Sequence, residues 1–244
     1  MQVAIVGGTN LEEIPIPYRE QPVVTPYGDV IVFRGTLDNG RDVIFLSRHG
    51  VLTRADPAEI NYRANIYALY SLGVTHVIGL SSVGACDYAY KLGTVCLIND
   101  FIDFTKSRAH SFDREHRQAL HTGMEDVCCP DLNDALEQMI LSRGLPYSGK
   151  VVYACTEGPR FETAAEVRMF RTLGAQIIGM TLVPEAPLAR DLGMHYAALG
   201  IIANYCTGMT SYVTDDSIEN VIRSMRENVF ELCFDFIKNA NSKP

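Results

Sequence analysis

The sequence is poor in basic residues and lacks several patterns that would assign it to a large class of proteins. Its 21 Lys and Arg are outnumbered by 29 Asp and Glu, which gives a formal net charge of -8. Binding to a nucleic-acid backbone depends on clustered positive charge, so this composition argues against a nucleic-acid partner. The opening apolar run, residues 3–6, breaks at Gly7 and Gly8, and no run is long enough to span a bilayer. We therefore expect a cytoplasmic protein without a membrane partner.

Disulfide and metal-binding patterns are lacking as well. The seven cysteines are an odd number, and most lie in apolar runs, where a free thiol behaves as a small hydrophobic side chain. Cys128 and Cys129 are adjacent rather than spaced as in a CxxC motif, and the six histidines form no HxxxH or HExxH pair. The sequence thus predicts neither a disulfide framework nor a metal site.

The chain does contain a regular alternation of strand-like and helix-like segments. Short β-branched runs predict buried strands at residues 3–6, 43–47, 76–80, 94–98, 151–155, 177–180 and 197–203. Amphipathic stretches that end on glycines predict helices at residues 57–72, 131–142, 164–173 and 184–192. A last helix is predicted over residues 216–237, with Asp216 as its cap and Glu219 completing a capping box. Because no linker or repeat divides the chain, we expect one α/β domain over residues 1–244.

Polar residues follow the predicted strands at four places, which is where ligands of α/β sheets collect. The four junctions are Val6-Gly7-Gly8-Thr9, Leu46-Ser47-Arg48-His49-Gly50, Leu80-Ser81-Ser82-Val83-Gly84 and Gly179-Met180-Thr181. They offer hydroxyls, a guanidinium and unencumbered backbone N–H groups, as a compact oxyanion needs. Each one alone is also typical of a tight turn or a surface pair, and the first lacks the GxGxxG spacing of a dinucleotide site. Their recurrence in one chain favours an anion site.

Five motifs in order along the chain resemble the trimeric purine nucleoside phosphorylases, in particular their methylthioadenosine and methylthioinosine phosphorylase branch. The motifs are GGTN at residues 7–10, RHG at 48–50, NYRAN at 61–65, TEGPRFET at 156–163 and GMTLVPEA at 179–186. The resemblance implies a central mixed β-sheet flanked by helices. It also implies a reaction in which inorganic phosphate cleaves a purine from the C1′ carbon of its sugar, with no metal or organic cofactor.

The resemblance further assigns residues to the two substrates. Phosphate would be held by Thr9, Arg48, His49, Ser81, the backbone N–H of Ser82, and Thr181. Met180 would lie against the ribose, and Phe161 would pack on the base. Arg48 would supply the fixed positive charge that separates a phosphorylase from a nucleosidase using water. The family often has a second histidine where this chain has Thr53, so the phosphate loop departs from the family pattern there.

Two residues at family positions bear on the purine. A 6-oxopurine presents an acceptor at O6 and a donor at N1, whereas adenine presents the opposite pair. Where 6-aminopurine enzymes have an aspartate and a serine, this chain has Asn204 and Glu162, which suit a 6-oxopurine; Cys206 replaces a second aspartate. Asn204 would bind N7 more strongly in the transition state, so Asn204 and Glu162 are the expected catalytic residues. Alternatively, Glu162 caps the helix near Thr163, and Asn204 only ends its strand.

The sugar pocket and the assembly are implied in the same way. Ile218 stands where ordinary nucleoside phosphorylases have a histidine, and Val221 follows one turn later, so both would form an apolar wall for a 5′-methylthio group. Both also suit the core face of a helix. His121 matches a histidine that methylthio-type enzymes donate to a neighbouring subunit, which implies a homotrimer with shared active sites.

The leading hypothesis is phosphorolysis of 5′-methylthioinosine to hypoxanthine and 5-methylthioribose 1-phosphate. The near alternatives are an inosine or guanosine phosphorylase and a methylthioadenosine phosphorylase. A non-catalytic nucleotide-binding sensor on the same scaffold is the alternative from a different class, because a fold does not determine a function.

Overall fold

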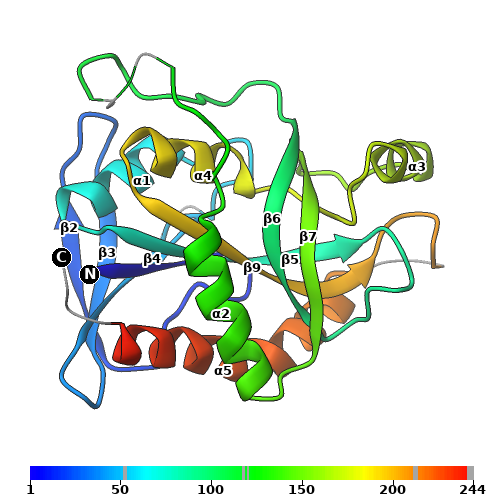
Figure 1. Ribbon diagram of the computed structural model, residues 1–244. Coiled ribbons are helices and arrows are strands. Elements are labelled where there is room, and N and C mark those ends of the chain that lie inside the picture. Colours follow the sequence, from blue (N-terminus) through cyan, green and yellow to red (C-terminus); the bar gives the residue numbers. More distant parts are fainter. Residues whose placement is uncertain (52–53, 117–118, 120, 211–213, 241–244) are drawn as a thin grey trace.

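The computed structural model describes residues 1–51, 54–116, 119, 121–210 and 214–240 (Figure 1). Within these residues one mixed sheet has the strand order β2-β3-β4-β1-β5-β8-β7-β6-β9. The strands are β1 (Val3–Gly7), β2 (Tyr18–Val23), β3 (Val30–Thr36), β4 (Asp42–Ser47), β5 (His76–Ala85), β6 (Val95–Phe104), β7 (Tyr147–Thr156), β8 (Ile177–Gly179) and β9 (His195–Tyr205). The helices are α1 (Tyr62–Ser71), α2 (Pro130–Ser142), α3 (Ala164–Thr172), α4 (Leu182–Asp191) and α5 (Asp215–Asn239).

Strand β9 closes one half of the sheet into a ring. It pairs in parallel with β5 and antiparallel with β6, so that β5, β8, β7, β6 and β9 surround a common interior. Strands β1, β4, β3 and β2 continue from β5 as an open sheet that ends in the β2–β3 hairpin. Strand β1 is buried along its whole length and β9 from Tyr196 to Ala203, because both faces of these central strands are covered.

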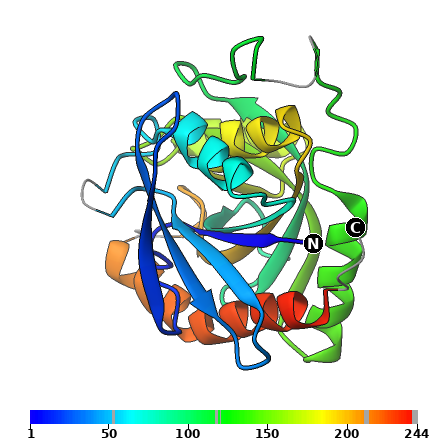
Figure 2. The ribbon, with the colours of Figure 1, turned by 90° about the vertical axis from the view of Figure 1, so that its left-hand side faces the viewer.

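The helices cover the two faces of the sheet. Helices α1 and α4 pack together on one face, and α5 crosses the opposite face with α2 beside it (Figures 1 and 2). Each pair encloses its own apolar cluster. Leu69 and Leu188 belong to the first cluster, and Leu136 and Phe230 belong to the second. The expected mixed sheet flanked by helices is confirmed.

All seven expected strands and all five expected helices are present, with corrected boundaries. Helix α1 begins at Tyr62 rather than at residue 57, because the Asn61 side chain accepts a hydrogen bond from the Ala64 N–H and caps it there. Helix α5 is capped by Thr214 and Ser217 rather than by Asp216 and Glu219.

Two further differences concern strands. The β2–β3 hairpin was not expected, since β2 is exposed over most of its length and carries polar residues. Strands β5 and β9 run on to Ala85 and Tyr205, because they pair with each other along ten positions. Ser81, Ser82 and Asn204 therefore lie inside strands rather than after strand ends.

Candidate active site

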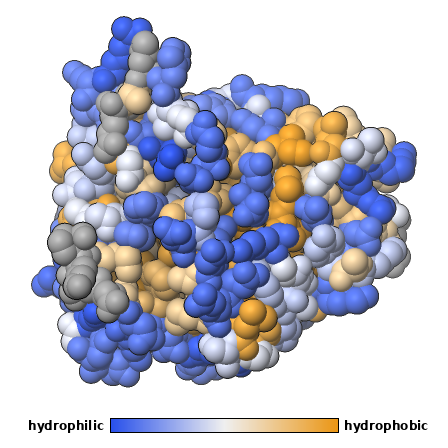
Figure 3. All heavy atoms as spheres, in the orientation of Figure 1, coloured by the Kyte–Doolittle hydropathy of each residue, from blue (hydrophilic) through white to orange (hydrophobic). Residues whose placement is uncertain are grey.

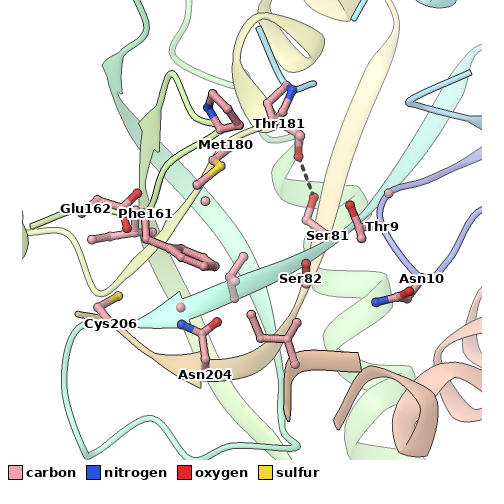
Figure 4. A pocket seen from close by; sticks show the side chains of 18 of the residues that line it. Thr9, Asn10, Ser81, Ser82, Phe161, Glu162, Met180, Thr181, Asn204 and Cys206 are labelled. Atoms are coloured by element: carbon pink, nitrogen blue, oxygen red, sulfur yellow. Dashed lines mark hydrogen bonds between the residues drawn. The ribbon is translucent and has the colours of Figure 1, made fainter. Parts of the chain in front are cut away.

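A cavity of about 360 Å³ lies where β1, β4 and β8 end and where the β5–β9 pairing skips Ala203 of β9, between Val83 and Gly84 of β5. The loop before α3 and the first turn of α5 complete its wall. Eleven of the residues expected in the site line it, and they come from seven separate stretches of chain: Thr9, Arg48, His49, Ser81, Ser82, Phe161, Glu162, Met180, Thr181, Asn204 and Ile218. Figure 4 shows Thr9, Ser81 and Thr181 at one end and Phe161, Glu162, Cys206 and Asn204 at the other.

Two hydroxyls face each other at the first end, which we call the hydroxyl end. Ser81 Oγ and Thr181 Oγ1 are 3.3 Å apart, and both side chains are buried. Thr181 is the N-cap residue of α4, yet its side chain makes no capping bond. Its backbone N–H instead donates to the Tyr153 hydroxyl at 3.2 Å. The Thr181 hydroxyl is therefore free of the usual capping role and can donate to a ligand.

Arg48 lies behind this end, and its charge is balanced within the protein. Its Nε and Nη2 donate to the two carboxylate oxygens of Glu185 at 2.6 and 2.8 Å, and neither side chain is exposed. Tyr196 donates to the same carboxylate at 2.7 Å. Burial alone would lower the pKa of Arg48, but the adjacent Glu185 outweighs it and holds that pKa above its ordinary value. Arg48 therefore keeps the fixed positive charge expected of it, and Glu185 balances that charge.

Close approach of the backbone keeps Arg48 in place. Its Nη1 donates to the Leu80 carbonyl at 2.8 Å, and Asn65 of α1 donates to the Arg48 carbonyl at 3.0 Å. A Cβ atom on Gly8 would lie 2.6 Å from Arg48 Nη1, so the GGTN loop can pass the guanidinium only with glycine there. The GGTN, RHG and NYRAN motifs thus meet around one side chain.

His49 has a defined hydrogen-bonding state. Its Nδ1 lies 2.8 Å from the Ala55 carbonyl oxygen, which can only accept, so Nδ1 carries a proton. Burial is the largest cause that lowers the pKa of His49 below its ordinary value. In the neutral ring, Nε2 is then an acceptor. Thr53, the other residue of interest in this loop, lies outside the described residues.

Glu162 and Asn204 lie at the opposite end, which we call the amide end. Thr156 Oγ1 donates to Glu162 Oε1 at 2.7 Å. Burial raises the pKa of Glu162 above its ordinary value, while the Thr156 bond opposes that rise. Thr163 and Glu166 form the capping box of α3, so Glu162 is not the helix cap.

Asn204 directly follows the bulge of β9 at Ala203. It pairs with Gly84, where a Cβ atom would lie 3.1 Å from Asn204 Nδ2 and 2.9 Å from Cys206 Sγ. Its Nδ2 donates to the Tyr205 carbonyl at 3.1 Å, which leaves Oδ1 and a second N–H for a ligand. Asn204 does not end the strand, so that alternative no longer accounts for it.

Two expected residues do not line the cavity. Val221 packs against the apolar cluster under α5, because only the first turn of that helix, with Ile218 and Glu219, reaches the cavity. The expected apolar wall is thereby reduced to Ile218. His121 is exposed on the segment between β6 and α2 and is likewise outside the cavity lining.

The sequence profile of the Phosphorylase superfamily matches residues 2–238. The chain belongs to this superfamily. It is 40% identical to the 6-oxopurine nucleoside phosphorylase of Pyrococcus furiosus, over 95% of this chain and 90% of that protein. It is 39% identical to the probable S-methyl-5′-thioinosine phosphorylase of Methanocaldococcus jannaschii, over 96% of this chain and 91% of that one. The structure of methylthioadenosine phosphorylase from Schistosoma mansoni with adenine has a TM-score of 0.90 at 25% identity, covering 98% of this chain and 91% of that one.

Arg108 was not expected to belong to the site. Its guanidinium is buried and donates to the carbonyls of Met180, Val183 and Glu157 at 2.6 to 2.7 Å. It therefore ties together the two loops that carry Met180 and Glu162. Nothing in the sequence of its polar loop indicates that this arginine joins two other loops through hydrogen bonds.

The role of Glu185 as the partner of Arg48 was also not expected, although Glu185 lies within the GMTLVPEA motif. Among the described residues, no three His, Cys, Asp or Glu side chains lie close enough together to bind a metal ion. No helix in the described ranges is long and apolar enough to cross a membrane.

Proposed function

We propose that this protein cleaves 5′-methylthioinosine with inorganic phosphate, forming hypoxanthine and 5-methylthioribose 1-phosphate. Relatives named for 6-oxopurine nucleosides, methylthioinosine and methylthioadenosine are 40%, 39% and 41% identical to the chain, so their names do not choose the substrate. The choice rests on the chemistry of the cavity.

The buried Glu162 carboxylate is the observation that carries the proposal. Its Oε1 is occupied by the Thr156 hydroxyl, which leaves Oε2 as an acceptor for a ligand. The N1–H of a 6-oxopurine satisfies that acceptor. Adenine N1 has no hydrogen, so it would leave a buried carboxylate oxygen unpaired, at a cost of about 1–3 kcal/mol. Asn204 complements this choice, since its amide NH₂ can donate to O6 and its Oδ1 can accept from N7–H once the departing base has taken up a proton from solvent at N7.

Bound phosphate is the proposed nucleophile. Ser81, Thr181, Thr9 and the Ser82 N–H would hold it at the hydroxyl end, with His49 and Arg48 behind. As the bond from C1′ to the purine lengthens, the sugar gains positive charge and the phosphate dianion stabilises it. The base gains electron density, so N7 becomes more basic and takes up a proton from solvent as the bond to C1′ breaks. The N7–H then donates to Asn204 Oδ1, a bond that the ground-state nucleoside cannot make, and this difference accelerates the reaction.

The 5′ substituent separates the leading proposal from its nearest alternative. Ile218 lines the cavity and offers an apolar contact to a methylthio group. Glu219 lines it as well, and its carboxylate could accept from a 5′-hydroxyl, although it also bonds Arg223. Inosine or guanosine phosphorolysis is therefore the second candidate.

Steady-state kinetics with three nucleosides tests the proposal. We expect kcat/KM to be highest for methylthioinosine, lower for inosine and lowest for methylthioadenosine. A preference for inosine would favour the Glu219 alternative, and a preference for methylthioadenosine would overturn the role of Glu162. Release of free base must require phosphate. If no base is released, the sensor alternative replaces the enzyme.

A homotrimer with shared sites is also proposed, with His121 of each protomer reaching a neighbouring cavity. His121 is exposed, and apolar side chains gather near β6, β7 and α3 on the face in Figure 3, where Met169 and Leu173 of α3 are exposed. Light scattering should give the mass of a trimer. Mixing inactive His121→Ala and Ser81→Ala proteins after reversible dissociation should restore activity if the sites are shared.

We further propose that the reaction needs no metal or organic cofactor. Activity should therefore survive dialysis against a chelator. The cytoplasmic location stays a prediction.

A further inference from the structure

The hydroxyl end of the cavity has no surplus positive charge. Arg48 is the only lysine or arginine among the described residues that line the cavity. Both carboxylate oxygens of Glu185 accept from it at 2.6 and 2.8 Å, and its Nη1 donates to the Leu80 carbonyl. An oxyanion here meets an ion pair rather than a free cation. Its recognition must therefore depend on the direction of individual hydrogen bonds.

Most groups at this end can donate. Ser81 and Thr181 carry hydroxyls 3.3 Å apart, and a hydroxyl can rotate to donate to an anion. Ser82 also lines the cavity and carries a further hydroxyl. These donors would accept any tetrahedral oxyanion of suitable size and would not distinguish one from another.

His49 is different because one of its nitrogens is committed. Nδ1 donates to the Ala55 carbonyl at 2.8 Å, so the neutral ring has only Nε2 left, and Nε2 can only accept. The charged groups that act on the ring are Arg48, Glu12 and Glu185, and burial keeps the ring neutral. His49 also lines the cavity, so Nε2 is the one acceptor that this side chain can present to a ligand beside those donors.

We propose that His49 Nε2 accepts a hydrogen bond from the hydroxyl of a protonated oxyanion, so that this end selects phosphate and arsenate over sulfate of equal charge. The inference rests on the proposed function in placing the anion at this end of the cavity. Hydrogen phosphate carries a P–OH group that satisfies Nε2. Sulfate is also a tetrahedral dianion, but it has only acceptor oxygens, and one of them would face the Nε2 lone pair.

Equilibrium binding to the purified full-length protein tests this without turnover. Isothermal titration at mildly alkaline pH and constant ionic strength would compare phosphate and arsenate with sulfate and monofluorophosphate. The last is a dianion close to phosphate in size that lacks the hydroxyl. We expect Kd for sulfate and for monofluorophosphate to exceed that for phosphate by at least about tenfold, or about 1.4 kcal/mol. Equal affinity of either for the site, or binding of no anion, overturns the inference.

A variant identifies the responsible side chain. In His49→Gln the amide can turn to present its NH₂ group, so the ratio of sulfate Kd to phosphate Kd should fall by at least about threefold. His76→Gln, at the opposite end of β5, is the matched control and should keep the wild-type ratio. An unchanged ratio in His49→Gln would remove His49 from the assignment.

The binding and kinetic results separate the two proposals. Anion discrimination without nucleoside cleavage would reject the phosphorylase function and keep the His49 assignment. Phosphate-dependent cleavage with sulfate bound as tightly as phosphate would support the phosphorylase function and reject the His49 assignment.

Discussion

Arg48 and Glu185 form a two-point ion pair, with N–O distances of 2.6 and 2.8 Å, in a region where neither side chain is exposed. They are 137 positions apart in the chain. Tyr196 adds a third hydrogen bond to the carboxylate. The pair fixes the wall of the cavity behind Ser81 and Thr181.

Glu185→Gln should destabilise the protein strongly. It leaves the Arg48 charge buried without its partner, and breaking a buried pair in this way costs about 3–5 kcal/mol. Denaturant unfolding measures the loss. Glu231→Gln, which removes a partly exposed partner of Arg143, is the control and should cost less than about 1 kcal/mol. Equal effects of the two changes would contradict the importance given to burial.

The activity should depend on pH through Glu162. Because burial raises its pKa, Glu162 takes up a proton at a higher pH than an ordinary glutamate. The protonated acid no longer offers a carboxylate to N1–H. We expect kcat/KM for methylthioinosine to fall as the pH drops through this raised pKa. In Glu162→Gln this acidic limb should disappear, and its persistence would assign the titration to another group.

Glu162→Gln should also stabilise the protein near neutral pH. A carboxyl whose folded pKa is raised favours the folded state below its unfolded pKa, and that contribution is lost as the pH rises through the folded pKa. Near neutral pH the buried carboxylate is therefore unfavourable, and the neutral amide can still accept from Thr156. A higher Tm with lower kcat/KM is expected. A lower Tm would mean that ionised Glu162 stabilises the fold.

Asn204→Asp should reverse the base preference. A carboxylate cannot donate to O6 of a 6-oxopurine but can accept from the 6-amino group of adenine. The ratio of kcat/KM for methylthioinosine to that for methylthioadenosine should fall by at least about tenfold, the equivalent of about 1.4 kcal/mol. Cys206→Ser leaves the amide in place and is the control. Unchanged selectivity in Asn204→Asp would count against its role.

Arg108→Lys should loosen both loops of the site. An ammonium group cannot reach the carbonyls of Met180, Val183 and Glu157 together, and an unpaired buried carbonyl costs about 1–3 kcal/mol. We expect a lower Tm and a raised KM for nucleoside. Added guanidinium at millimolar concentration should partly restore activity to Arg108→Ala. A KM that does not change in either variant would make Arg108 purely structural.

Strand and helix positions were predictable because their signals are local. Short apolar, β-branched runs located β1, β4, β5 and β9, and the Asn61 cap lies inside the recognised NYRAN motif. Strand β2 was missed because an exposed strand lacks an apolar run, whereas β3 was missed although it begins with the apolar run of residues 30–33. Ser81 and Ser82 were expected after the end of their strand, but they lie inside β5. Pairing between β5 and β9, rather than local propensity, extends both strands.

The sequence by itself determined the α/β class, the family and half of the residues that line the cavity, because ordered motifs and apolar periodicity depend on neighbouring residues. Only the tertiary structure decided that Glu185 balances Arg48, that Ala55 sets the proton on His49, that Arg108 joins two loops and that Val221 faces the core. These relationships depend on which distant backbone and side-chain atoms come within hydrogen-bonding or packing distance. The spacing of residues along the chain does not specify that proximity.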